Sequence, residues 1–168
     1  TVGSNGAAIH ATIGRDLKAA IEGERPDLVE ALWKKMWWAT HYGGRGGSAA
    51  MAIAAVDIAL WDLKARRLGA PLWTLLGGHD ARVPGYAGGI DLYFALDKLL
   101  AQTDDNLKKG FRAIKMKVGR AKLSEDVARV AAMREHLGAD FPLMVDANMR
   151  WTPDEAIRAA RALQAFDV

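Results

Sequence analysis

Residues 111–118 read Phe-Arg-Ala-Ile-Lys-Met-Lys-Val, and Gly119 follows them directly. This mostly apolar run, closed by a glycine, is typical of a strand in a covered sheet. Side chains two residues apart on a strand share a face, so we expect Lys115 and Lys117 to point the same way at its C-terminal end. That end is where parallel sheets and barrels build active sites. Taken alone, the pair also fits a frayed strand end whose lysines are solvated.

A second strand with a polar end follows one helix later. Residues 124–137 predict a helix, and residues 141–146 read Phe-Pro-Leu-Met-Val-Asp, a strand that Asp146 closes, with Asn148 two positions on. Lys117 and Asp146 are separated by 146 − 117 = 29 residues, one strand–helix unit. Because the C-terminal ends of parallel strands meet at one mouth, we expect the lysines beside the carboxylate. Taken alone, Asp146 also suits a turn or a helix cap.

The second half of the chain repeats this strand–helix pattern. Strands are predicted at 83–87, 111–118 and 141–146, and helices at 91–109, 124–137 and 152–165. Ser124 is the predicted cap of one helix, and Thr152-Pro153-Asp154-Glu155 is a capping box with proline in the first turn. Phe166 and Val168 could open a fourth strand. The alternation predicts an α/β parallel sheet, in a barrel or a doubly wound fold, and three units cannot close an eight-stranded barrel.

The first half predicts helices at 15–20, 26–38, 48–68 and 71–76, with Ser48 capping the third. The glycine-rich loop at 41–47 is not a P-loop, because no Gly-Lys-Ser/Thr follows, and no strand precedes it as a dinucleotide site requires. Arg45 in this loop is a candidate contact for an anionic substrate. The four histidines show no metal-ligand spacing.

Composition excludes several classes of protein. The 168 residues carry a net charge of +3 with the basic residues scattered among acidic ones, so no nucleic-acid partner is expected. Cysteine is absent, which excludes disulfides and thiolate metal sites. The longest apolar stretch, at 49–61, is interrupted by Asp57 and is too short for a bilayer. We therefore expect a cytoplasmic protein with no membrane contact.

Four stretches together resemble a known family. Residues 54–65 (Ala-Ala-Val-Asp-Ile-Ala-Leu-Trp-Asp-Leu-Lys-Ala) and 68–78, the strand at 110–119 and the strand at 143–148 are similar, in this order, to the mandelate racemase/muconate lactonizing branch of the enolase superfamily. The resemblance covers nearly the whole chain. It implies an α+β capping domain, of which residues 1–80 would be the C-terminal portion with linker helices. Residues 81–168 would be the first three βα units of a (β/α)₇β TIM-like barrel.

The same resemblance implies roles for the strand-end residues. Lys117 would be the base on one face of the substrate, and Lys115 would favour its neutral amine and help hold the substrate carboxylate. Asp146 would be the first of three acidic Mg²⁺ ligands, and Asn148 a polar neighbour of the substrate. Mg²⁺ would stabilise the enediolate formed when the proton next to the carboxylate is removed, a pattern known for this superfamily.

The family also has two further acidic metal ligands and a His/Asp pair on later strands, which this sequence does not contain. The chain also starts at Thr1. We therefore expect a piece of a longer protein, and we expect this piece to be inactive alone. For the whole protein, the residues around 41–47 and 88–91 look most like talarate/galactarate dehydratases, which favours dehydration of a sugar acid. A racemase or epimerase of a 2-hydroxy acid, a non-catalytic fragment and a nucleotide-binding α/β domain are the alternatives. A small-molecule carboxylate is the expected partner, and a homo-oligomer the expected assembly.

Overall fold

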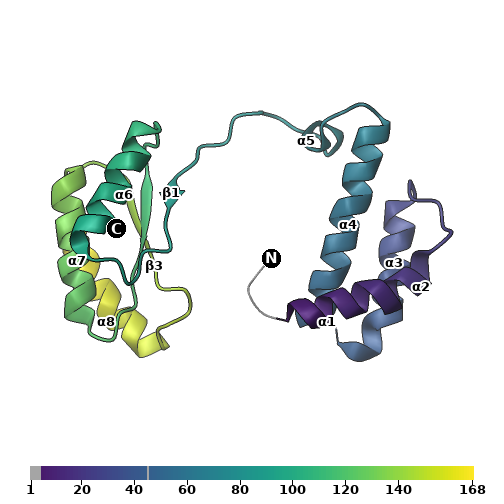
Figure 1. Ribbon diagram of the computed structural model, residues 1–168, viewed down its shortest axis with the longest axis horizontal. Helices are drawn as coiled ribbons and strands as arrows, with labels where there is room; N and C mark the ends of the chain where they lie inside the picture. The colour runs from purple at the N-terminus through teal and green to yellow at the C-terminus, as the bar shows by residue number, and fades with distance from the viewer. Residues whose placement is uncertain (1–4, 45) are drawn as a thin grey trace. The chain divides into compact units, whose positions relative to one another are not determined.

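The computed structural model describes residues 5–44 and 46–168. The chain divides into two compact units, Thr1–Ala81 and Arg82–Val168, each with its own hydrophobic core (Figure 1).

The first unit is helical. One continuous helical segment comprises α1 (Gly6–Ala11), a π-helical stretch (Thr12–Leu17) and α2 (Lys18–Ile21), longer than the predicted 15–20. It is followed by α3 (Val29–Thr40), a short 3₁₀ turn (His41–Gly43), α4 (Gly47–Arg67) and α5 (Leu72–Leu75). The buried core residues come from the N-terminal helical segment, α3 and α4: Leu17, Val29, Leu32, Met36, Ala52, Ile53 and Leu60. Among the described residues, every helix is too short or too polar to cross a bilayer.

The predicted cap of α4 is wrong. Ser48 lies inside the helix, which begins at Gly47 with Gly46 in the N-cap position and no side-chain cap. Gly47 has φ of +57°, a conformation that glycine adopts at little cost, so the chain turns into the helix two residues earlier than a serine cap at position 48 requires.

The second unit is a three-stranded parallel sheet with crossover helices. Its elements are β1 (Ala87–Gly88), α6 (Leu96–Lys108), β2 (Ile114–Lys117), α7 (Leu123–Leu137), β3 (Leu143–Asp146), α8 (Pro153–Leu163) and a final 3₁₀ turn (Gln164–Phe166). The strand order is β1-β2-β3, and Lys117 is in register with Asp146. The α/β class with a parallel sheet is confirmed.

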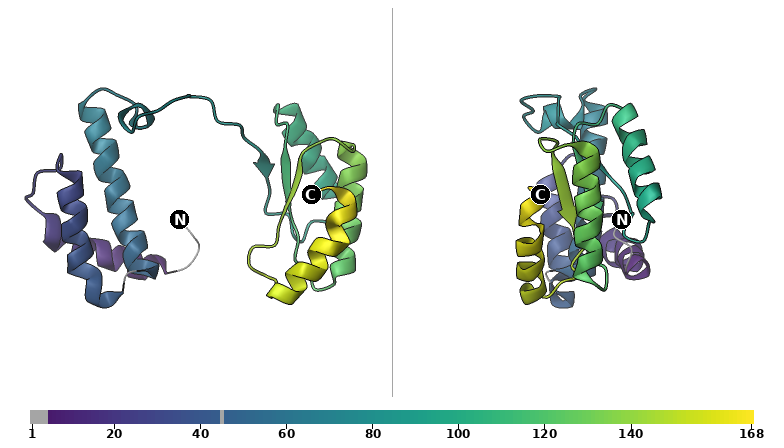
Figure 2. Two further views of the ribbon diagram at one scale, coloured as in Figure 1. Left: turned by 180° about the vertical axis from the view of Figure 1, so that it is seen from behind. Right: turned by 90° about the vertical axis from the view of Figure 1, so that its left-hand side faces the viewer.

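The helices α6, α7 and α8 lie together on one side of the strands (Figures 1 and 2). Burial alternates along β2, so Ile114 and Met116 pack in the helix-covered core while Lys115 and Lys117 lie on the other face. The sheet therefore presents its lysines on the face that these helices leave uncovered.

Two predicted boundaries and one predicted strand are wrong. Pro84 lacks an N–H and Val83 is exposed, so β1 pairs only at Ala87–Gly88 and the strand predicted at 83–87 is shorter and later. The helix predicted from residue 91 begins at Leu96, because Asp91 is buried and bonded elsewhere. Phe166 lies in the 3₁₀ turn rather than in a fourth strand, and Arg134 donates to its carbonyl oxygen.

The capping box of α8 is confirmed. The side chain of Thr152 accepts from the backbone N–H of Glu155, whose carboxylate accepts from the backbone N–H of Thr152 at 2.8 Å. Ser124, in contrast, does not cap α7: Lys122 takes the N-cap position without a side-chain bond.

Candidate active site

The ends of β2 and β3 bring Lys115, Lys117 and Asp146 together. The Nζ atom of Lys117 lies 2.8 Å from Oδ2 of Asp146, and Nζ of Lys115 lies 3.3 Å from the same oxygen. All three side chains are mostly but not fully buried, with 24%, 16% and 28% of their surface exposed, respectively. The sequence-based expectation that the lysine pair lies beside the carboxylate matches this geometry.

Electrostatics keep Asp146 ionised. The hydrogen bond from Lys117 lowers the pKa of Asp146 most, the backbone N–H of Asn148 lowers it further, and Lys115 adds to the effect, so the pKa falls from 3.8 to about 2. Burial opposes this shift only in part. Two ammonium groups around one carboxylate leave a net charge of +1, which attracts a further anion, and a metal ion at Asp146 would have to displace these lysine contacts.

Asn148 shapes the turn that follows β3. Its backbone N–H donates to Oδ1 of Asp146 at 2.8 Å, so both carboxylate oxygens of Asp146 are engaged. Asn148 and Met149 have φ of +47° and +61°, a left-handed conformation that is uncommon outside glycine and that costs free energy in a residue such as methionine. The side chain of Asn148 is exposed at the site edge.

Two neighbours of the lysines were missed in the sequence. Tyr86 accepts a hydrogen bond of 3.3 Å from Nζ of Lys115, and this bond, followed by the contact with Asp146, raises the pKa of Lys115. Tyr86 directly precedes β1, the strand next to β2. The predicted order of the strands could therefore have indicated that Tyr86 lies close to Lys115. Asp91 accepts from the backbone N–H of Lys117 at 2.8 Å, a contact that the helix predicted from residue 91 does not reveal.

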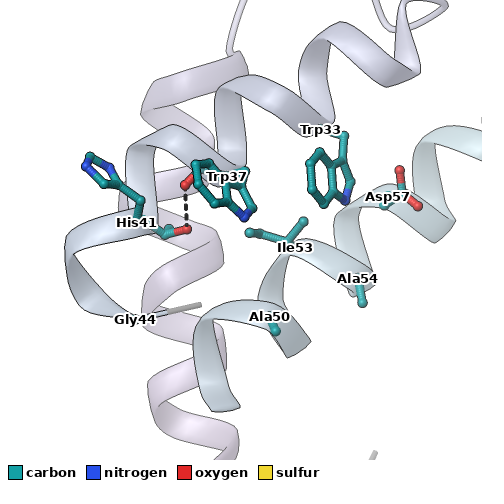
Figure 3. A pocket seen from close by; sticks show the side chains of 9 residues that line it. Trp33, Trp37, His41, Gly44, Ala50, Ile53, Ala54 and Asp57 are labelled. Carbon is teal, nitrogen blue, oxygen red and sulfur yellow. Dashed lines mark hydrogen bonds between the residues drawn. The ribbon is translucent and has the colours of Figure 1, made fainter. Parts of the chain in front are cut away.

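Arg45, the remaining predicted site residue, lies outside the described residues. In the helical unit, a hollow of about 220 Å³ lies between α3 and α4 (Figure 3). Trp33, Trp37 and Asp57 line it, and burial followed by the charge of Glu30 raises the pKa of Asp57. This hollow contains none of the strand-end residues.

Asp146 is the one predicted metal ligand at the strand ends. Within residues 5–44 and 46–168, no group of three or more His, Cys, Asp or Glu side chains could hold a metal ion. A single ionised, partly exposed carboxylate is the hard oxygen donor that Mg²⁺ prefers, and such an ion needs only one or two protein carboxylates beside water and substrate. The donor at the strand ends therefore fits a magnesium ion as one member of a larger ligand set.

The sequence matches two family descriptions. Residues 1–77 match the N-terminal domain of mandelate racemase/muconate lactonizing enzymes, and residues 98–168 match the enolase C-terminal domain-like family. The two matches lie in the order of the two units, and the chain belongs to the mandelate racemase/muconate lactonizing branch of the enolase superfamily.

Similar proteins catalyse different reactions. A 3,6-anhydro-α-L-galactonate cycloisomerase of Streptomyces coelicolor is 58% identical over 168 residues, which cover 100% of this chain and 46% of that protein. A racemase structure from S. coelicolor A3(2) with bound magnesium matches with a TM-score of 0.96 and 58% identity, over 100% of this chain and 50% of that one. An L-talarate dehydratase of Polaromonas sp. JS666, complexed with Mg and L-glucarate, matches with a TM-score of 0.88 and 37% identity, over 100% of this chain and 47% of that one. The chain spans about half the length of the curated relatives it matches.

Proposed function

We propose that this chain supplies the base and one magnesium ligand of an enzyme that removes the proton α to the carboxylate of a sugar acid. The observation that carries the proposal is the contact of 2.8 Å between Lys117 and Asp146 at neighbouring strand ends. This contact supports the proposal that a proton acceptor and a metal ligand act on one small substrate. The family membership and the magnesium bound by similar structures support the same assignment.

Each residue has a proposed part in the reaction. Bound Mg²⁺ would stabilise the negative charge that develops on the substrate carboxylate as the proton leaves. If Asp146 served as a metal ligand, Lys117 would lose its present hydrogen bond to that carboxylate, and its amine would be free to turn toward the α-carbon. Lys115, held by Tyr86, keeps its positive charge beside the carboxylate. Asn148 and Arg45 are proposed to contact the polar groups of the substrate.

The step after proton removal is proposed to be elimination of the oxygen on the β-carbon. In a galactarate or talarate this oxygen is a hydroxyl, and its loss is a dehydration. In a 3,6-anhydro-galactonate it is a ring ether: the bond between the β-carbon and this oxygen breaks, an acid protonates the oxygen, which stays on the molecule as a hydroxyl, and the ring-opened product is an isomer. The identity of 58% to the cycloisomerase favours a 3,6-anhydro-galactonate as substrate. The residues at 41–47 and 88–91 favour galactarate or talarate instead. Racemisation or epimerisation of a 2-hydroxy acid needs the same first step.

The proposal extends to the whole protein. We propose that β1, β2 and β3 begin a (β/α)₇β barrel, that residues 1–80 belong to a capping domain, and that the whole protein is a cytoplasmic homo-oligomer. The division of the chain after Ala81 and the parallel strand order support the first two parts.

A substrate panel tests this proposal. The whole protein is incubated with Mg²⁺ in D₂O and with 3,6-anhydro-L-galactonate, galactarate, L-talarate or mandelate, and the products are followed by mass spectrometry and NMR. Loss of one water indicates dehydration, ring opening at constant composition indicates cycloisomerisation, and deuterium at an inverted α-carbon indicates racemisation. Absence of α-deuterium and of product with every acid would reject the proposed function.

A further inference from the structure

At Lys117, β2 is paired with β3 on one side but has no strand beside it on the other, because β1 ends earlier. The N–H groups of Ile114 and Val118 donate to residues at β3, so the alternate residues of β2 direct their backbone groups toward β1. The register of β1 with β2 stops at Gly88 and Lys115. The N–H and carbonyl of Lys117 therefore point to the open side of the sheet.

Two buried side chains take the place of the missing strand. Oδ1 of Asp91 accepts from the N–H of Lys117 at 2.8 Å, and Nη1 of Arg129 donates to its carbonyl oxygen, also at 2.8 Å. The side chains of Asp91 and Arg129 are 1% and 6% exposed. Both polar groups of the Lys117 backbone are thus bonded to charged groups shielded from water, which form stronger hydrogen bonds than neutral partners.

The two side chains are also bound to each other. Nη2 of Arg129 donates to the carbonyl oxygen of Asp91 at 2.8 Å and lies 3.6 Å from its carboxylate. Gln102 donates to the other carboxylate oxygen of Asp91 at 3.4 Å. Asp126, fully buried, accepts from the N–H groups of Gly119 and Arg120. Residues 117–120 are therefore held by one buried network.

Stability alone does not account for this network. Burying ionised groups costs free energy that their attraction recovers only in good geometry, and apolar replacements often do as well. Here Nε of Arg129 and Oδ1 of Asp126 are buried without a hydrogen-bond partner. What the network fixes is the backbone of the residue that ends β2, and a strand end without a neighbour would otherwise fray.

We infer that Asp91 and Arg129 are positioning residues for Lys117. They fix the direction in which its amine leaves the strand end, and thus its approach to a substrate beside Asp146. The inference rests on the proposed function and assigns a role to two residues outside the lysine pair. Misplacement of a reacting group by about 1 Å can cost about 100-fold in rate.

Asp91→Ala in the whole protein tests the inference. Amide hydrogen exchange, measured by NMR, should become roughly 10- to 100-fold faster at Lys117, while the Val118 amide, bonded to Asp146 on the other side, stays protected. With Mg²⁺ and whichever of galactarate, L-talarate and 3,6-anhydro-L-galactonate the wild type converts, kcat should fall about 100-fold and KM change less than about threefold.

Conservative and control variants sharpen the test. Asp91→Asn keeps an oxygen for the Lys117 amide, so kcat should stay within about tenfold of the wild type and the exchange at Lys117 should rise less. Asp104→Ala is the matched control, because this carboxylate on the same unit bonds to His136 at a partly exposed site. It should change neither the exchange at Lys117 nor kcat.

Several results would overturn the inference. One is a folded Asp91→Ala variant with kcat within about twofold of the wild type. Another is faster exchange along all of β2 in step with the loss of activity, which marks a structural role only. If Asp91→Ala does not fold, Asp91→Asn decides: a fall in kcat of about 100-fold without faster exchange at Lys117 overturns the inference. Failure of the proposed function is distinct, because Lys117→Ala would then retain α-proton exchange, or no acid would be converted.

Discussion

Replacing Lys117 by methionine should strengthen magnesium binding in the whole protein. The substitution removes the ammonium that lies 2.8 Å from Oδ2 of Asp146 and keeps a flexible side chain of similar length. Lys115 stays at 3.3 Å from the same oxygen, so the net charge of the three side chains falls from +1 to zero. A cation that binds Asp146 then has one competitor fewer.

The size of the effect follows from the pKa of Asp146. A pKa that falls from 3.8 to about 2 corresponds to about 2.4 kcal/mol of preference for the ionised form. Solvent screening at a side chain that is 28% exposed reduces this to about 1.5 kcal/mol. Lys117 is the largest cause, so we assign about 1 kcal/mol to it, which corresponds to roughly fivefold tighter binding of Mg²⁺.

Isothermal titration calorimetry of Mg²⁺ near neutral pH and at constant ionic strength measures this change. Lys108→Met is the matched control, because it removes an exposed lysine 3.5 Å from Asp105 and should leave the affinity unchanged. An affinity of Lys117→Met equal to that of the wild type, or lower, would refute the competition between Lys117 and the metal for Asp146.

Three further predictions concern Asp146 and α8. Asp146→Asn should weaken Mg²⁺ binding at least about tenfold by calorimetry, and Asp140→Asn, at an exposed position, should not; equal affinities would reject Asp146 as a ligand. Because folding lowers the pKa of Asp146, its contribution to stability is complete above about pH 4 and is lost as the pH falls toward 2, so acid unfolding followed by tryptophan fluorescence should be less steep in Asp146→Asn. Thr152→Ala should cost about 1 kcal/mol in thermal unfolding, whereas Thr152→Ser should cost little; equal losses would contradict the capping role of the hydroxyl.

The parts of the fold that follow from local sequence could be predicted. The strands at Ile114–Lys117 and Leu143–Asp146 lie inside the predicted ranges because apolar residues continue to a polar end. The capping box at Thr152 depends on residues three apart, so its chemistry is visible in the sequence. The meeting of Lys117 with Asp146 could be predicted as well, because parallel strands one unit apart bring their ends together.

The rest depends on contacts between distant residues. The local sequence pattern at Asp91 predicts a helix, but the carboxylate of Asp91 bonds to the backbone of Lys117, 26 positions away. Arg129 lies on α7, whose sequence is typical of an ordinary amphipathic helix. The neighbouring residues do not indicate that Arg129 donates to the backbone carbonyl of Lys117. The sequence does not show that Ser124 fails to cap α7. Asp126 in the same turn accepts hydrogen bonds from the N–H groups of Gly119 and Arg120, and these contacts depend on the folded loop before the helix.

The most direct test of Lys117 as the base is α-proton exchange in D₂O. The whole protein, its Lys117→Ala variant and the control Lys108→Ala are compared with Mg²⁺ and an acid that the wild type converts. The account predicts that Lys117→Ala loses about 10²- to 10⁴-fold in exchange rate while it still binds Mg²⁺, and that Lys108→Ala behaves as the wild type. Exchange by Lys117→Ala at the wild-type rate would contradict it.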